Sequence, residues 1–134
     1  MEQLSSTMID AGATLVRHLE REGIRLSAAL WSFDAETGRW SLVLGSPDVR
    51  TAGPLALYRK AGQQLARMGD PEEVPVYRLE FVDPRSSLTP LPTGSAGMGR
   101  GASGRRVTGA TIGGVYLEDA YVYKLAARAR RVAA

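Results

Sequence analysis

Two stretches in which apolar and polar residues alternate, each interrupted by a short turn, limit the folds open to this chain more than any other feature. The first runs as IRLSAALWSFD over residues 24–34 and resumes as RWSLVLG over residues 39–45, with a glycine-containing turn between them. A period of two side chains fits a strand and not a helix. We therefore predict a β-hairpin whose first strand has one face made of Ile24, Leu26, Ala28 and Leu30 and another made of Arg25, Ser27, Ala29, Trp31 and Phe33.

A second hairpin is predicted near the end of the chain. The segments RRVTGATI (105–112) and VYLEDAYVYKL (115–125) flank Gly113-Gly114, a two-residue glycine turn of the kind that closes hairpins. One more strand is expected over residues 74–84, VPVYRLEFVDP, with Tyr77, Leu79 and Phe81 facing inward.

Two helices are predicted from apolar spacing and from end signals. In residues 4–22 the apolar positions recur every three or four residues, Ser5 or Ser6 is suited to cap the start, and Gly23 is suited to end the helix with Ile24 folded back on Leu19. The second helix starts at Pro54 and stops before Gly69-Asp70-Pro71, with proline and glycine at the ends where helices favour them.

The order of these elements predicts the α+β class. We expect a two-layer sandwich with an antiparallel sheet of about five strands and two helices on one face, in the order αββαβ-loop-ββ. The length of 134 residues fits one domain, assigned to residues 1–125, followed by a basic tail at 126–134. The proline- and glycine-rich loop at 84–104 is longer than about 15 residues, so it is expected to be a site or a flexible insertion.

Composition narrows the function classes. The chain has no cysteine, which excludes disulfides, thiolate metal sites and cysteine nucleophiles. It shows neither the basic start of a signal peptide nor an apolar run near the roughly 20 residues that span a bilayer, so we expect a cytoplasmic protein without a membrane partner. Residues 1–99 hold ten basic and twelve acidic side chains, whereas residues 100–134 hold seven basic and two acidic ones, which favours an anionic partner near the C-terminal third.

The stretch GRGASG at residues 99–104 has the spacing G-x-G-x-x-G of a dinucleotide-binding loop. That loop needs a strand before it and a helix after it, and here a Pro/Ser/Gly-rich loop precedes it and a β-branched strand follows. We expect no dinucleotide and no other cofactor. The arginines in and after this stretch instead predict an anion- or nucleic-acid-binding surface made of Arg100, Arg105, Arg106, Arg128, Arg130 and Arg131.

Asp119 is the carboxylate that the pattern singles out, because strict alternation puts it on one face with Val115, Leu117, Tyr121 and Tyr123. A carboxylate on an apolar face needs a partner or a raised pKa. One expected use is chemical: Asp119 acts as a general base or as a metal ligand, in the second case in a two-carboxylate site with Glu80 or Asp83. The other is structural: an arginine or tyrosine satisfies the carboxylate, or a bulge turns it outward. The second use is favoured, and no metal site is predicted.

Two segments, LWSFDAETGRWSLVLGSP and GVYLEDAYVYKL, resemble parts of small uncharacterised bacterial α+β proteins, a resemblance that implies no activity. The order of elements is similar to that of the roadblock-type sandwich folds, which implies partner binding without chemistry.

These observations support three function hypotheses, of which the first is favoured. The first is a non-enzymatic protein-binding or assembly module of a bacterial complex, acting through another protein or through self-association. The alternative is binding of nucleic acid or another polyanion through the Gly/Arg loop and the Arg-rich tail. The third is a metal-dependent hydrolase using Asp119, Glu118 or Glu80.

Overall fold

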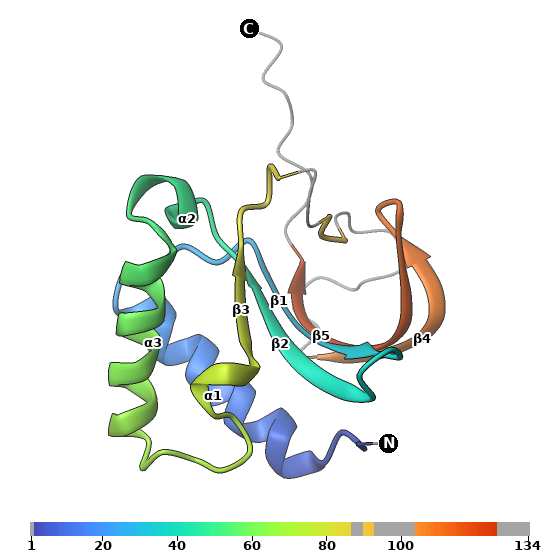
Figure 1. Cartoon of the computed structure of the whole chain (residues 1–134), viewed down its shortest axis with the longest axis horizontal. Helices are drawn as coiled ribbons and strands as arrows, with labels where there is room; N and C mark the ends of the chain where they lie inside the picture. Colours follow the sequence, from blue (N-terminus) through green and yellow to red (C-terminus); the bar gives the residue numbers. More distant parts are fainter. Residues whose placement is uncertain (1, 87–89, 93–103, 126–134) are drawn as a thin grey trace, which may run out of the picture.

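The computed structural model describes residues 2–86, 90–92 and 104–125 and confirms the predicted α+β class (Figure 1). One five-stranded sheet has the strand order β3-β2-β1-β5-β4. Its elements are α1 (Ser6–Arg21), β1 (Ala28–Asp34), β2 (Arg39–Gly45), α2 (Asp48–Thr51), α3 (Pro54–Arg67), the 3-10 turn η1 (Val76–Arg78), β3 (Leu79–Val82), β4 (Arg105–Ile112) and β5 (Val115–Leu125).

The sheet is mixed rather than antiparallel throughout. The pairs β1·β2, β1·β5 and β4·β5 are antiparallel, but β3 runs parallel to β2. The reason lies in the connection: the chain leaves β2, crosses through α2 and α3, and returns in the same direction, as parallel neighbours require.

The ends of α1 form as the sequence predicts. The Oγ of Ser5 accepts a hydrogen bond from the backbone N–H of Met8 at 3.1 Å. Gly23 has a φ of +86°, and the N–H of Ile24 donates to the carbonyl of Leu19 at 3.1 Å, which is the long bond of a Schellman ending.

Two hydrophobic clusters lie on opposite faces of the sheet. The helix-side core joins α1 and α3 to one face through side chains that include Leu15, Leu19, Trp31, Leu42 and Leu57. The other face is concave, because the sheet curls away from the helices toward β4 (Figure 1). Its concave-side core consists of Ala28, Leu30, Val43, Val82, Leu91, Leu117, Ala120 and Val122, with Val107, Ile112, Val115 and Leu125 packed against it.

The third strand is shorter than predicted. Residues 76–78 form η1 after Pro75, and the strand begins only at Leu79. Tyr77, expected to face inward, is therefore 75% exposed. The turn carries Arg78 toward the start of β2, where its guanidinium donates to the carbonyl of Trp40 at 3.1 Å.

None of the helices in the described part of the chain has the length and apolarity that crossing a bilayer requires.

Candidate functional site

The β4–β5 ribbon holds the residues that the sequence brought forward as site candidates. The predicted hairpin is confirmed: the two strands pair from Arg105↔Val122 to Ile112↔Val115. Gly113 and Gly114 both have positive φ, at +56° and +83°, which a tight two-residue turn between twisted strands requires.

The ribbon has a kink at its middle that changes which face each side chain occupies. Val107 pairs with Ala120 on one side of the kink, Ile112 pairs with Val115 on the other, and all four pack in the concave-side core. Regular alternation would put Val107 and Ile112 on opposite faces. The pairing register is the same on both sides of the kink, so both strands must contain one extra residue between these pairs for all four side chains to share a face. Gly109, which lies at this point of β4, has a φ of +57°.

Because of the kink, Asp119 does not share a face with all the residues that strict alternation predicts. This residue shares the helix-side face with Tyr121 and Tyr123, which pack against the helix-side core, but Val115 and Leu117 belong to the concave side. The Asp119 side chain is 25% exposed and accepts two hydrogen bonds from Arg106, at 2.6 Å from Nε and 2.7 Å from Nη2. Of the two expected uses, the structure shows pairing with an arginine.

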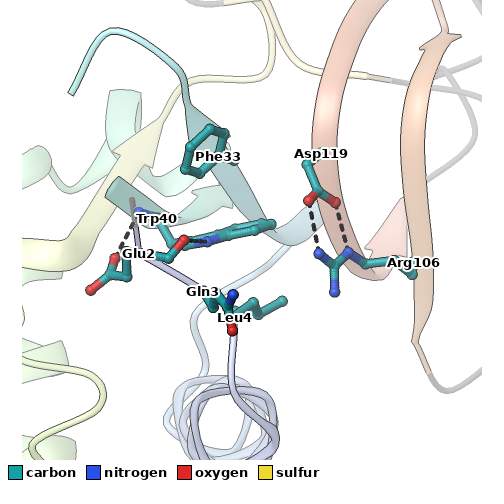
Figure 2. A pocket seen from close by; sticks show the side chains of 7 residues that line it. All are labelled: Glu2, Gln3, Leu4, Phe33, Trp40, Arg106 and Asp119. Atoms are coloured by element: carbon teal, nitrogen blue, oxygen red, sulfur yellow. Dashed lines mark hydrogen bonds and ion pairs between the residues drawn. The ribbon is translucent and has the colours of Figure 1, made fainter. Parts of the chain in front are cut away.

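A hollow of about 300 Å³ lies beside this ion pair, between the ribbon, the ends of β1 and β2, and the segment before α1. Figure 2 shows Arg106 and Asp119 on one side and Phe33 and Trp40 on the other. The guanidinium carbon of Arg106 lies 5.4 Å from the centroid of the Trp40 ring, within the range of a cation–π contact. Gln3 and Leu4 complete the wall together with Glu2.

Glu2 forms an anchor that the sequence did not indicate. Its carboxylate binds the guanidinium of Arg78 through both oxygens and accepts the backbone N–H of Trp40 at 3.0 Å, while its carbonyl accepts the indole N–H of Trp40 at 3.1 Å. The hydrogen bond from Arg78 is the main cause that lowers the pKa of Glu2 to about 2. A lone acid near the chain start and an arginine 76 positions away share no sequence pattern, so no local signal points to this pair.

The charges around the hollow are neutralised in pairs. The hydrogen bond from Arg106 lowers the pKa of Asp119, and the hydrogen bond from Arg78 does the same for Glu2. Both carboxyl groups are therefore ionised at neutral pH. A general base that works near pH 7 needs a pKa close to that pH, which neither group has.

The strand order does not place Asp119 beside Glu80, as the suggested two-carboxylate metal site requires. Glu80 lies on β3, and β2 and β1 separate that strand from β5 in the sheet. Asp83 instead pairs with Arg50 at 2.9 Å. Among the described residues, no three histidine or acidic side chains come together as metal ligands would.

The structure describes only some residues of the glycine motif and of the predicted arginine surface. Gly104, the last residue of GRGASG, has a φ of +94°, and a Cβ there would lie 2.1 Å from the Tyr121 hydroxyl. Packing thus explains this glycine, and β4 follows it at Arg105 where a nucleotide-binding loop needs a helix. Arg106 is engaged by Asp119 and Arg105 is exposed at the start of β4, while Arg100, Arg128, Arg130 and Arg131 lie outside the described residues. Polyanion binding stays a prediction.

The two edges of the sheet differ sharply. At one edge, β3 has four residues, carries the exposed Glu80 and is flanked by Pro75 and Pro84. At the other edge, β4 has eight residues, and the segment from Val107 to Ile112 contains neither charge nor proline. Within the described residues β4 pairs with β5 alone, so its outer backbone edge is open.

Comparisons of the chain with protein-family models, with curated proteins and with solved structures give no match.

Proposed function

We propose that this protein is a non-enzymatic binding module of a larger assembly, and that it receives an extended segment of another polypeptide as an added strand along β4. Strand addition uses the free N–H and C=O groups of a sheet edge, and side-chain pockets along the edge add specificity.

The contrast between the two sheet edges carries this proposal. Proteins guard edge strands with charges, prolines, bulges and short length, because an open edge pairs with other chains. The edge at β3 has three of these guards, whereas β4 has the kink at Gly109 and charged residues only at its first two positions, Arg105 and Arg106. β4 also contains the β-branched residues Val107, Thr108, Thr111 and Ile112, which favour extended pairing.

The hollow beside β4 supports a binding role rather than a catalytic one. Its ionised groups are held by each other, as Arg106 with Asp119 and Arg78 with Glu2. Its apolar wall of Phe33 and Trp40 and the half-exposed Arg106 are residue types that protein interfaces favour. A chain docked on β4 would pass beside these groups, since Arg106 belongs to that strand.

The experiment blocks the edge with charge. Thr108 and Thr111 are exposed, so the double variant Thr108→Lys/Thr111→Lys adds two guards to β4 without replacing a buried residue. It also removes the hydrogen bond between the Thr108 side chain and Asp119, so thermal unfolding verifies that the variant stays folded. The matched control, Gln63→Lys/Ala66→Lys, adds the same charge on the exposed face of α3. Tagged full-length chains of the three kinds are used to purify partners from the native host, in which untagged copies are also present.

We expect the wild type and the α3 control to retain the same polypeptide, and the edge variant to lose it by at least about tenfold. The retained polypeptide should also slow hydrogen exchange in the peptide that covers residues 105–112. Equal recovery by all three chains, or a partner that leaves exchange in β4 unchanged, would overturn the proposal.

A further inference from the structure

Resting on the proposed function, we infer that the chain that pairs with β4 is a second copy of this protein, related by a two-fold axis between Thr108 and Gly109. The two β4 strands run antiparallel, and the sheets join into one across the axis. Such an interface is isologous, so the same strand serves on both sides.

The kink in β4 favours a second copy of this chain over a partner strand with regular alternation. On β4 the concave-side residues Val107 and Ala110 are separated by two residues, Thr108 and Gly109, where a regular strand has one. A partner strand with regular alternation matches side-chain faces on one side of the kink and mismatches them on the other. In β5, Glu118 and Asp119 likewise separate the concave-side residues Leu117 and Ala120. The side-chain faces of β4 and β5 therefore match on both sides of the kink.

A second copy provides the same step in the required place. With the axis between Thr108 and Gly109, the two-residue step of one chain lies opposite that of the other. Val107 then faces Ala110 of the second copy on the concave side, and Arg106 faces Thr111 of the second copy on the helix side. Both halves of the strand therefore keep matched faces through the kink.

The charges of β4 agree with this antiparallel arrangement. Arg105 and Arg106 stand at one end of the strand, and the other end is uncharged. In the antiparallel pair the arginines lie opposite Ile112 and Thr111 of the second copy, so no like charges meet. A parallel pair of two copies in register would place each arginine opposite itself, which destabilises a sheet.

The first test uses charge at Thr111, which is exposed and lies opposite Arg106 of the second copy in this arrangement. Sedimentation equilibrium of the full chain should show a dimer. Thr111→Lys places like charges in contact twice per dimer and should weaken dimerisation by about tenfold, whereas Thr111→Glu places opposite charges there and should leave it equal or tighter. Circular dichroism and thermal unfolding verify that both variants stay folded.

The second test reads the register directly, because the chain has no cysteine of its own. Val107→Cys and Ala110→Cys are made as separate proteins. Directly opposite residues in an antiparallel pair have Cα atoms about 4.5–5.5 Å apart, which is within disulfide range. Two copies of position 107 are offset by three residues, or about 10 Å. We expect rapid oxidation to a disulfide dimer in the mixture, at least about tenfold faster than in either protein alone.

The outcomes separate this inference from the proposed function. A monomer at all concentrations, a dimer indifferent to both charges at Thr111, or cross-linking no faster in the mixture would overturn the second copy as occupant. If the chain is a monomer and the edge-lysine variant still loses a different polypeptide, the proposed function stands and the occupant is that polypeptide. If no polypeptide is lost, both fall.

Discussion

At the scale of single residues, partly buried polar contacts link parts of the chain that are far apart in sequence. The hydroxyl of Tyr123 accepts the indole N–H of Trp31 at 2.9 Å and donates to the carbonyl of Ile9 at 2.5 Å, so one side chain joins β5, β1 and α1. Glu2 similarly joins the chain start to β2 and η1 through Trp40 and Arg78. Neither set could be predicted, because the partners are separated by dozens of positions and no periodic pattern connects them.

Removing the hydroxyl of Tyr123 should destabilise the protein. Tyr123→Phe leaves the Trp31 N–H and the Ile9 carbonyl without this partner, and an unsatisfied buried polar group costs about 1–3 kcal/mol. Urea unfolding followed by tryptophan fluorescence measures the change in the free energy of unfolding. Tyr116→Phe, at a side chain that is 65% exposed, is the control and should have no measurable effect; equal losses in both variants would contradict this role.

Glu2 should make stability depend on pH in the acid range. Its pKa is lowered from 4.5 to about 2 in the folded chain, so its contribution is fully present above pH 4.5 and is lost as pH falls from about 4.5 to about 2. Allowing for solvent screening, we expect ionised Glu2 to contribute on the order of 1–2 kcal/mol to the free energy of unfolding. Glu2→Gln should be less stable than the wild type at pH 6, and the difference should narrow toward pH 2. A constant difference across that range would show that Glu2 does not act through its charge.

At the scale of elements, local signals were sufficient where a structure depends on near neighbours. The Ser5 cap, the Gly23 ending of α1 and the Gly113-Gly114 turn each depend on a few adjacent residues, and all three were predicted correctly. The direction of β3 and the phase change at Gly109 were not, because each depends on which strand lies alongside. The exposure of Tyr77 was not predicted either, because residues 76–78 form η1 where a strand was expected. An isolated glycine inside a strand was the one signal for the kink.

The packing of α1 against the sheet gives a prediction with an internal control. A Cβ on Gly12 would lie 2.4 Å from the Tyr123 hydroxyl and 2.8 Å from the Trp31 indole nitrogen, whereas a Cβ on Gly62 of α3 would meet nothing within 4 Å. Gly12→Ala should therefore destabilise by about 1–3 kcal/mol despite the better helix propensity of alanine. Gly62→Ala should stabilise by about 0.5–1 kcal/mol.

Thermal and urea unfolding of both glycine variants check this pair. Adding Tyr123→Phe to Gly12→Ala should recover part of the loss, because it removes the atom nearest to the new methyl group. A stabilising Gly12→Ala would mean that α1 does not approach β5 as closely as described.

At the scale of the whole molecule, the described residues place a guarded strand, β3, at one edge of the sheet and leave the outer edge of β4 without a paired strand. The sequence predicted the α+β class and a binding role among its hypotheses, but it could not show that β4 is the outer strand, since strand order follows from long-range pairing. For the same reason the sequence could not show that Glu80 and Asp119 lie on strands that are not neighbours. The uncharged segment from Val107 to Ile112 suggests strand pairing with another chain only because β4 is an edge strand.

Hydrogen exchange in β4 at two protein concentrations tests the central claim most directly. If the edge is covered by a second copy, the peptide spanning residues 105–112 should exchange slowly at high concentration and markedly faster on dilution, and Thr111→Lys should exchange fast at both. Peptides from α3 should be unaffected by dilution and serve as the reference. Exchange in β4 that is the same at both concentrations and in both proteins would contradict the account.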